Sequence, residues 1–168
     1  MNKKLLAKLK KIKLLILDVD GVLTDNSVYI GSDGNEFKKF NIQDGFGIYL
    51  VQKAKVEVAL ISGRFSKTTE FRAKELDIRI VYNGYTDKEK VLEKIKQKTN
   101  LEYSEIAYMG DDLPDLPVLR KTGVALAVNN AQSEVKKVCD YITKSSGGNG
   151  AVREVINLIL KAKNIKLE

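Results

Sequence analysis

The chain has 168 residues, 43% of them hydrophobic and 30% charged, which is typical of a globular protein with one domain and a sizeable core. It has no histidine, which excludes Ser-His triads and histidine metal ligands. A single cysteine, Cys139, excludes an intramolecular disulfide and suits the reducing cytoplasm. No apolar run reaches the roughly 18 residues of a membrane span, so we expect a cytoplasmic protein without one.

The formal charge of +7 is concentrated at the start of the chain. Residues 1–13 carry six lysines and no acid, so the remainder has a net charge of only +1. Leu5, Leu9 and Ile12 fall near helical spacing, which predicts a short amphipathic helix. We expect it to pack on the body with its lysines in solvent; contact with a membrane surface or a phosphate backbone is the alternative. The charge therefore does not predict a nucleic-acid partner.

Short apolar runs then alternate with amphipathic stretches. The runs predict strands at Leu14–Val19, Val56–Ile61, Ile78–Tyr82, Ile106–Met109, Val124–Val128 and, more weakly, Tyr141–Ile142. The stretches predict helices over about 45–54, 67–76, 88–99, 114–121, 133–138 and 151–162. Because most of the runs are continuous rather than alternating, the sequence predicts an α/β fold with a parallel sheet covered by helices on both faces.

One stretch breaks this alternation. After Asp25, "SVYIGSDGNEFKKF" predicts two short strands around a turn at Gly31–Gly34. This β-hairpin flap, over 26–41, would project over the carboxyl end of the first strand. We expect a single domain over 1–168, with the basic extension at 1–13 and a Gly-rich segment and C-terminal helix at 145–168.

Polar residues follow four of the predicted strands, at the sheet edge where ligands bind in open α/β folds. In chain order they are Asp18, Asp20 and Gly21; Ser62, Gly63 and Arg64; Lys88; and Asp111, Asp112 and Asp115. Each group has a structural alternative. Ser62-Gly63 could be a turn, "DDLPD" a helix cap, and Lys88 a solvated lysine in a capping box made by Thr86 and Glu89.

The acids are best explained as a cluster. Crowded carboxylates would repel one another, and Mg²⁺ is a hard cation that takes one or two carboxylates together with a substrate phosphate. Ser62 and Lys88 would then supply donors for that phosphate. The set is suited to phosphoryl transfer, which depends mostly on positioning and charge neutralisation.

In order, "DVDGVLTD", Ser62, Lys88 and "GDDLPD" resemble the four motifs of the haloacid dehalogenase (HAD) superfamily of aspartyl-phosphate phosphatases, over about 14–160. The intervals between them hold no cap domain, so the chain is similar to the capless subgroup, which has a Rossmann-like three-layer sandwich. Within it, "KKFNIQDGFGI", "SGR", "GDDLPDLPVLRKTG" and "GGNGAVREV" resemble the family of 3-deoxy-D-manno-octulosonate 8-phosphate phosphatases, which serve lipopolysaccharide synthesis. That family usually has arginine in place of Gln43 and often Ala-His-Pro in place of Asn130-Ala131-Gln132.

The resemblance implies a residue role for each motif. Asp18 would be the nucleophile, and Asp20 the general acid and then the general base. Asp18, the Asp20 backbone carbonyl and Asp111 would hold Mg²⁺. Asp112 and Asp115 would lie next to these ligands without binding the ion directly. Ser62, Gly63 and Lys88 would bind the phosphoryl group, and Arg64 the carboxylate of a sugar acid phosphate.

The resemblance also implies a homotetramer, in which neighbouring hairpins and tails close the open sites. A nine-carbon sugar acid phosphate is an alternative substrate. A non-enzymatic oligomerisation module of the same fold is an alternative function. A receiver domain is disfavoured, because receivers place their acidic pair before the phosphorylated aspartate, whereas here Asp18 is in the first strand.

Overall fold

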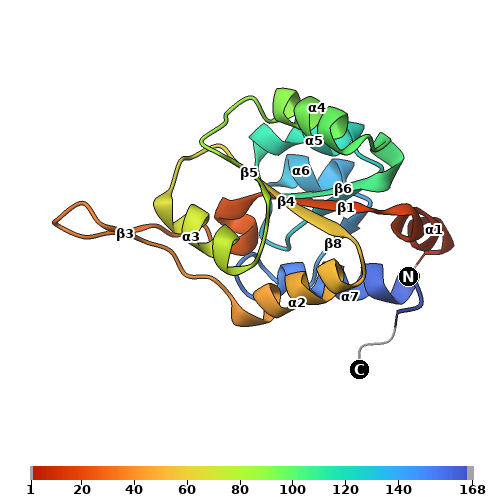
Figure 1. Cartoon of the computed structure of the whole chain (residues 1–168), viewed down its shortest axis with the longest axis horizontal. Coiled ribbons are helices and arrows are strands. Elements are labelled where there is room, and N and C mark those ends of the chain that lie inside the picture. The colour runs from red at the N-terminus through yellow and green to blue at the C-terminus, as the bar shows by residue number, and fades with distance from the viewer. Residues whose placement is uncertain (1, 166–168) are drawn as a thin grey trace.

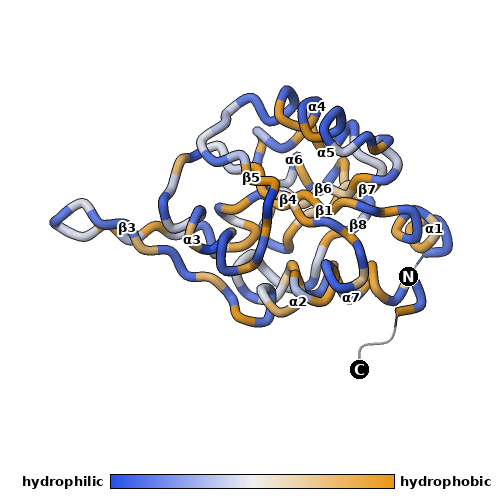
Figure 2. The backbone as a smooth tube through the Cα atoms, viewed as in Figure 1, coloured by the Kyte–Doolittle hydropathy of each residue, from blue (hydrophilic) through white to orange (hydrophobic). Residues whose placement is uncertain are grey.

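Six parallel strands form the central sheet of the protein, in a computed structural model that describes residues 2–165 (Figure 1). Their order is β5-β4-β1-β6-β7-β8. The strands are β1 (Leu14–Leu17), β4 (Glu57–Ser62), β5 (Ile80–Asn83), β6 (Ile106–Gly110), β7 (Val124–Ala127) and β8 (Tyr141–Ile142). All four residues of β1 are fully buried between β4 and β6, and Figure 2 shows the apolar character of the central strands. Burial on both faces explains why these segments are continuous apolar runs.

Helices cover both faces of the sheet. They are α1 (Lys3–Lys11), α2 (Ile42–Lys53), α3 (Lys67–Glu75), α4 (Lys88–Thr99), α5 (Leu116–Lys121), α6 (Ser133–Val138) and α7 (Ala151–Ala162). Helices α4, α5 and α6 lie on one face, and α2 and α7 on the other (Figure 1). The predicted three-layer α/β sandwich is therefore confirmed. None of the helices within residues 2–165 has the length and apolarity needed to cross a bilayer.

Capping groups move several predicted helix ends. Helix α2 begins at Ile42, three residues before the prediction, because the Asn41 side chain accepts hydrogen bonds from Gln43 N at 2.7 Å and Asp44 N at 3.2 Å. Asp87 caps α4 by accepting from Lys90 N at 3.0 Å, so the capping box predicted for Thr86 and Glu89 is wrong. The predicted helix over 114–121 is divided into a 3₁₀ turn, Leu113–Asp115, and α5.

The basic N-terminal segment packs against the body. Leu5, Leu9 and Ile12 are buried in the core, as the helical spacing predicts. Two of its lysines are held by acids of the body: Lys8 pairs with Asp140 at 2.6 Å and Lys13 with Glu105 at 2.6 Å. The other lysines of α1 remain exposed.

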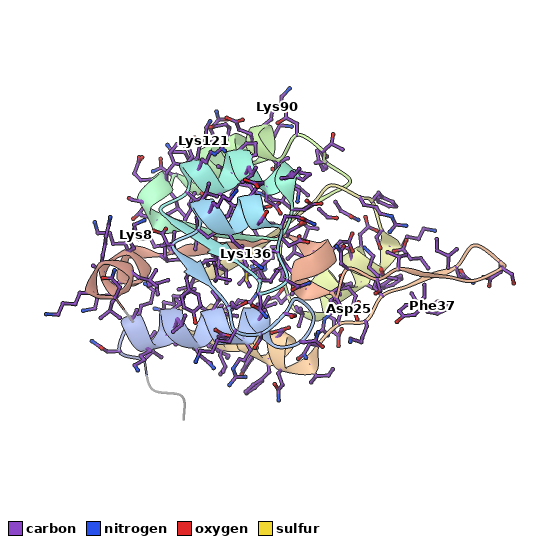
Figure 3. All side chains as sticks on the ribbon, turned by 180° about the vertical axis from the view of Figure 1, so that it is seen from behind. Lys8, Asp25, Phe37, Lys90, Lys121 and Lys136 are labelled. Carbon is purple, nitrogen blue, oxygen red and sulfur yellow. The ribbon has the colours of Figure 1, made fainter. Side chains whose placement is uncertain are left out.

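The predicted hairpin consists of β2 (Tyr29–Ile30) and β3 (Glu36–Phe37), an antiparallel pair that extends away from the body (Figure 1). In the reverse view, Asp25 lies where the hairpin joins the body, and Phe37 lies along the hairpin (Figure 3). No cap domain interrupts the described residues, and residues at the base of the hairpin, Asn26 and Val28, lie at the sheet edge.

The Gly-rich segment before α7 packs against the turn that follows β1. A Cβ on Gly147 would lie 1.7 Å from the Gly21 carbonyl oxygen, so only glycine fits there. Helix α7 begins after Gly150, which has no side chain to cap it. Asp44 of α2 replaces that cap by accepting from Gly150 N at 3.3 Å and Arg153 N at 2.7 Å.

Candidate active site

Strand ends and the base of the hairpin enclose a cavity of about 360 Å³. Its lining contains every site residue predicted from the sequence: Asp18, Asp20, Ser62, Gly63, Arg64, Lys88, Asp111, Asp112 and Asp115. A larger hollow of about 690 Å³, beside α2 and the start of β4, contains none of them. The chemistry-bearing side chains therefore converge in the smaller cavity.

Asp18 is fixed where β1 ends. Its backbone N–H donates to Met109 O at 3.0 Å, and its Oδ1 accepts from Val19 N at 2.7 Å. The chain then makes one wide turn over Val19–Leu23, in which Gly21 has a φ of +86°. A Cβ on Gly21 would lie 2.1 Å from Asp111 Oδ2, so this glycine makes room for the second acid as well as for the turn.

Lys88 lies between two carboxylates. Its Nζ is 2.9 Å from Asp18 Oδ2 and 2.7 Å from Asp115 Oδ1, and its side chain is only 5% exposed. Burial opposes the ammonium charge, but Asp18 and then Asp115 outweigh it and raise the pKa of Lys88. Lys88 therefore begins α4 as a buried, charged donor at the cavity and is not solvated.

Asp115 is the most fully bonded of the acids. Its Oδ1 also accepts from Tyr108 Oη at 2.5 Å, and its Oδ2 accepts from Asp111 N at 2.9 Å and Asp112 N at 3.2 Å. Tyr108 lies in an apolar strand, and sequence analysis gave it no role. Asp115 holds Lys88 in place. Because its oxygens already accept these hydrogen bonds, they have little capacity left for another ligand.

Asp18 and Asp111 are acids with strongly raised pKa values. Oxygens of Asp18, Asp111 and Asp115 lie within 4.8 Å of one another. Burial, followed by repulsion from Asp115, raises the pKa of Asp18 to about 7; burial, followed by repulsion from Asp18, raises that of Asp111 to about 8. Asp111 Oδ1 is buried without a hydrogen-bond donor. This oxygen-only donor set fits a hard cation, which would compensate the repulsion.

Ser62 and Gly63 end β4 beside this cluster. Ser62 Oγ donates to Arg64 O at 2.8 Å, and the side chain is buried. A Cβ on Gly63 would lie 3.9 Å from Lys88 Cε, which places Gly63 next to the lysine stem. Asp112 is exposed and accepts from Leu113 N at 2.8 Å, so it caps the 3₁₀ turn as well as lining the cavity.

The hairpin adds residues that sequence analysis missed. Arg64 pairs with Glu36, the first residue of β3, and this hydrogen bond is the largest cause that lowers the pKa of Glu36 to about 2. Lys38 Nζ lies 2.7 Å from Asp20 Oδ1. The sequence "KKF" gives no signal that separates Lys38 from Lys39, which pairs instead with Asp25 at 3.0 Å.

The two departures from the family pattern lie in the first turn of α2 and beside the Gly-rich segment. Gln43 is exposed in the first turn of α2, beside the capping residue Asn41. Asn130 Oδ1 accepts from Gly147 N at 2.9 Å and so supports the Gly-rich segment. Both are outside the residues that line the cavity.

Comparison with known proteins follows the same residues. A model of haloacid dehalogenase-like hydrolases matches 51–156. The 3-deoxy-D-manno-octulosonate 8-phosphate phosphatase KdsC of Escherichia coli K12 is 43% identical over 158 residues, covering 94% of this chain and 84% of the relative. The chain belongs to the haloacid dehalogenase-like hydrolases. Within this family its relatives are phosphatases, so the protein is a phosphomonoesterase.

Solved structures of the family superpose over nearly the whole chain. The Yersinia pestis 3-deoxy-D-manno-octulosonate 8-phosphate phosphatase is 38% identical with a TM-score of 0.96, covering 98% of this chain and 89% of that one. The Moraxella catarrhalis phosphatase, solved in complex with magnesium ion, phosphate ion and KDO molecule, is 43% identical with a TM-score of 0.95. It covers 98% of this chain and 94% of that one. The predicted family and fold are confirmed.

Proposed function

We propose that this HAD hydrolase converts 3-deoxy-D-manno-octulosonate 8-phosphate to the free sugar acid and phosphate through an aspartyl phosphate on Asp18. The observation that carries the proposal is the buried contact of Asp18 with Lys88 beside Asp111, in a cavity at the sheet edge. The similarity to phosphatases named for this substrate, over 94% of the chain, supports the choice of sugar.

Mg²⁺ is the proposed cofactor. Asp18, the Asp20 backbone carbonyl and Asp111 would hold it, and the buried Asp111 Oδ1 without a donor supports this set. Asp115 belongs to the same acid cluster, but its oxygens already accept four hydrogen bonds. A bound cation supplies positive charge that offsets both the carboxylates and the phosphoryl oxygens.

The protein's own groups would then carry two displacements. An Asp18 oxygen attacks phosphorus, the bond from phosphorus to the sugar oxygen breaks, and Asp20 gives its proton to that oxygen. Asp20 next takes a proton from the water that attacks the aspartyl phosphate, which releases phosphate and restores Asp18. Lys88 and Ser62 hold the phosphoryl oxygens, and Ser62 must redirect the proton that it now donates to Arg64 O.

Arg64 is the proposed partner of the sugar carboxylate. A guanidinium fork matches a carboxylate in geometry and charge. In the free protein this arginine already forms an ion pair with Glu36. The substrate carboxylate would compete with Glu36 for the guanidinium or share it. The site should then prefer acidic sugar phosphates to neutral ones, which can be tested.

A homotetramer in the cytoplasm completes the proposal. The hairpin exposes Tyr29, Ile30 and Phe37 close to an uncapped site, which supports a role in contacts between subunits. The lone thiol of Cys139, whose pKa burial raises to about 12, is suited to a reducing compartment. Light scattering of the active protein tests the assembly, and a fully active monomer would contradict it.

The deciding experiment is a phosphate-release screen over sugar phosphates, with and without Mg²⁺. We expect Mg²⁺-dependent release, fastest with the eight-carbon acid phosphate, slower with the nine-carbon acid phosphate and slowest with neutral sugar phosphates. Asp18→Asn is the matched control for contaminating phosphatases. A preference for the nine-carbon substrate would reassign the sugar, and no release from any substrate would reject the function.

A further inference from the structure

The side chain of Lys38, which follows β3, is buried although most of the hairpin is exposed. Its side chain is 0% exposed, whereas that of the adjacent Lys39 is 54% exposed. A buried ammonium group is costly unless anionic groups face it. Two do so here: Asp20 Oδ1 at 2.7 Å and Glu36 Oε1 at 3.8 Å.

Glu36 ties this part of the hairpin to the body. Its carboxylate accepts from Ser66 Oγ at 2.6 Å and Thr68 Oγ1 at 3.4 Å, both at the start of α3, and pairs with Arg64 after β4. Lys38 is thus held between a carboxylate anchored to α3 and the carboxylate of Asp20. Its position is fixed by the body as much as by the two-residue strand that precedes it.

The two oxygens of Asp20 differ. Oδ1 is buried, accepts no hydrogen bond and contacts Lys38 through the ion pair alone. The Asp20 side chain is nevertheless 22% exposed and lines the cavity. The arrangement holds one oxygen against the hairpin and leaves Oδ2 for the cavity.

We infer that Lys38 is a positioning residue, which holds Asp20 Oδ1 so that Oδ2 faces the oxygen that leaves phosphorus. The inference rests on the proposed function, in which Asp20 moves the proton. Proton transfer by a well-placed acid or base contributes typically 10²–10⁴-fold to rate, and it requires hydrogen-bond distance to the reacting atom. A carboxylate free to rotate away from this position would lose much of that factor.

A double-mutant cycle tests the inference, with Lys38→Met made in the wild-type and Asp20→Asn backgrounds. We expect Lys38→Met to lower kcat for the eight-carbon acid phosphate by about tenfold or more and to change KM less than about threefold. In the Asp20→Asn background, the same substitution should cost almost nothing further, because the group it positions is already lost. Lys39→Met, one residue away, should leave kcat unchanged.

Three results would overturn the inference. An unchanged kcat would show that Lys38 has no such role. A large rise in KM would place Lys38 on the substrate, and an equal loss in both backgrounds would show that it acts independently of Asp20. Thermal melting and light scattering check that the variants fold and assemble. Lys38→Gln, which keeps a polar group of shorter reach, enters the same cycle if Lys38→Met does not fold. A wild-type protein without phosphatase activity would reject the proposed function instead.

Discussion

Two sides of the same cavity are held in different ways. The floor, made by Asp18, Lys88, Asp111 and Asp115, is built on the ends of β1 and β6 and the start of α4, and backbone N–H groups fix Asp115. Every one of these side chains is buried. Such groups have little freedom to move, and their charges lie in a medium that strengthens each interaction.

The hairpin side consists of Asp20 and Arg64, which line the cavity, together with Glu36 and Lys38, which pair with them. It is held by ion pairs between side chains. Arg64 remains 47% exposed, and the hairpin strands have only two residues each. An exposed pair such as that of Arg64 with Glu36 is worth less than a buried one and responds more readily to a bound ligand or a neighbouring subunit. The Lys38 side chain in the same group is buried. We infer that the floor and Asp20 provide the phosphoryl chemistry, and that Arg64 provides the choice of substrate.

The largest effect should come from the floor. Asp18→Asn should lower phosphate release by at least about 10³-fold, because an amide cannot form the acyl phosphate. Release of phosphate at saturating Mg²⁺ measures it, and circular dichroism checks the fold. Turnover near the wild-type rate would break the mechanism.

Within the floor, Asp111 and Asp115 should separate into different roles. Asp111→Ala should raise the Mg²⁺ concentration needed for half-maximal activity by about 10–100-fold, whereas Asp115→Ala should raise it less. Asp115→Ala should instead cost about 2–4 kcal/mol of unfolding free energy, because Tyr108 and Lys88 lose a buried partner. Mg²⁺ titration and denaturant unfolding of both variants measure the two effects. The reverse ranking would contradict the roles assigned to Asp111 and Asp115.

On the hairpin side, Arg64→Ala should act on one kind of substrate. We expect KM for the eight-carbon acid phosphate to rise roughly tenfold, equivalent to about 1.4 kcal/mol, and hydrolysis of a small aryl phosphate to stay nearly constant. Arg79→Ala, another exposed arginine in an ion pair, is the matched control. Equal losses on both substrates would assign Arg64 to the phosphate or the fold.

The smallest effect concerns stability and pH in metal-free protein. The pKa of Asp18 is about 7 and that of Asp111 is about 8, both above the ordinary value of 3.8. Between pH 3.8 and these raised values, the two groups therefore bind more protons in the folded state than in the unfolded state. The contribution of these two carboxyl groups to stability must then fall as pH rises from about 4 to 8.

Asp111→Asn should remove part of this loss. It should melt at least about 2 °C above the wild type at pH 8 without metal and at nearly the same temperature at pH 4. Saturating Mg²⁺ should reverse the order at pH 8, because the variant has lost a ligand. A variant that is no more stable at pH 8 would mean that Asp111 is not under the repulsion described.

Sequence alone predicted the floor well and the hairpin side only in part. Floor residues such as Asp18 and Asp111 directly follow strands, so strand prediction also predicts their common edge. Lys38, just after β3, contacts Asp20 in the turn after β1, and no periodicity or spacing encodes an ion pair between a hairpin and a turn distant in the sequence. The role of Tyr108 could not be predicted for another reason, since its ring belongs to an apolar strand and only its hydroxyl is polar.

Local capping was partly readable. Asn41, a strong capping residue, stands immediately before α2 and could have moved the predicted start to Ile42. At α4, Thr86 and Asp87 are both plausible caps, and only the backbone geometry selects Asp87. The cap that Asp44 supplies to α7 joins elements far apart in the chain, so no local pattern reveals it.

The central place of β1 has a consequence for biosynthesis. Among the six strands of the sheet this one leaves the ribosome first, yet its two neighbours are encoded much later: Leu14 pairs with Glu57 on one side and Ile106 on the other. At translation rates of about 5–20 residues per second, the nascent LLIL segment waits several seconds for its second partner. During that interval its apolar surface is open to chaperones or to other nascent chains. The nucleophile that follows β1 is therefore made early but reaches its final surroundings only when most of the chain exists.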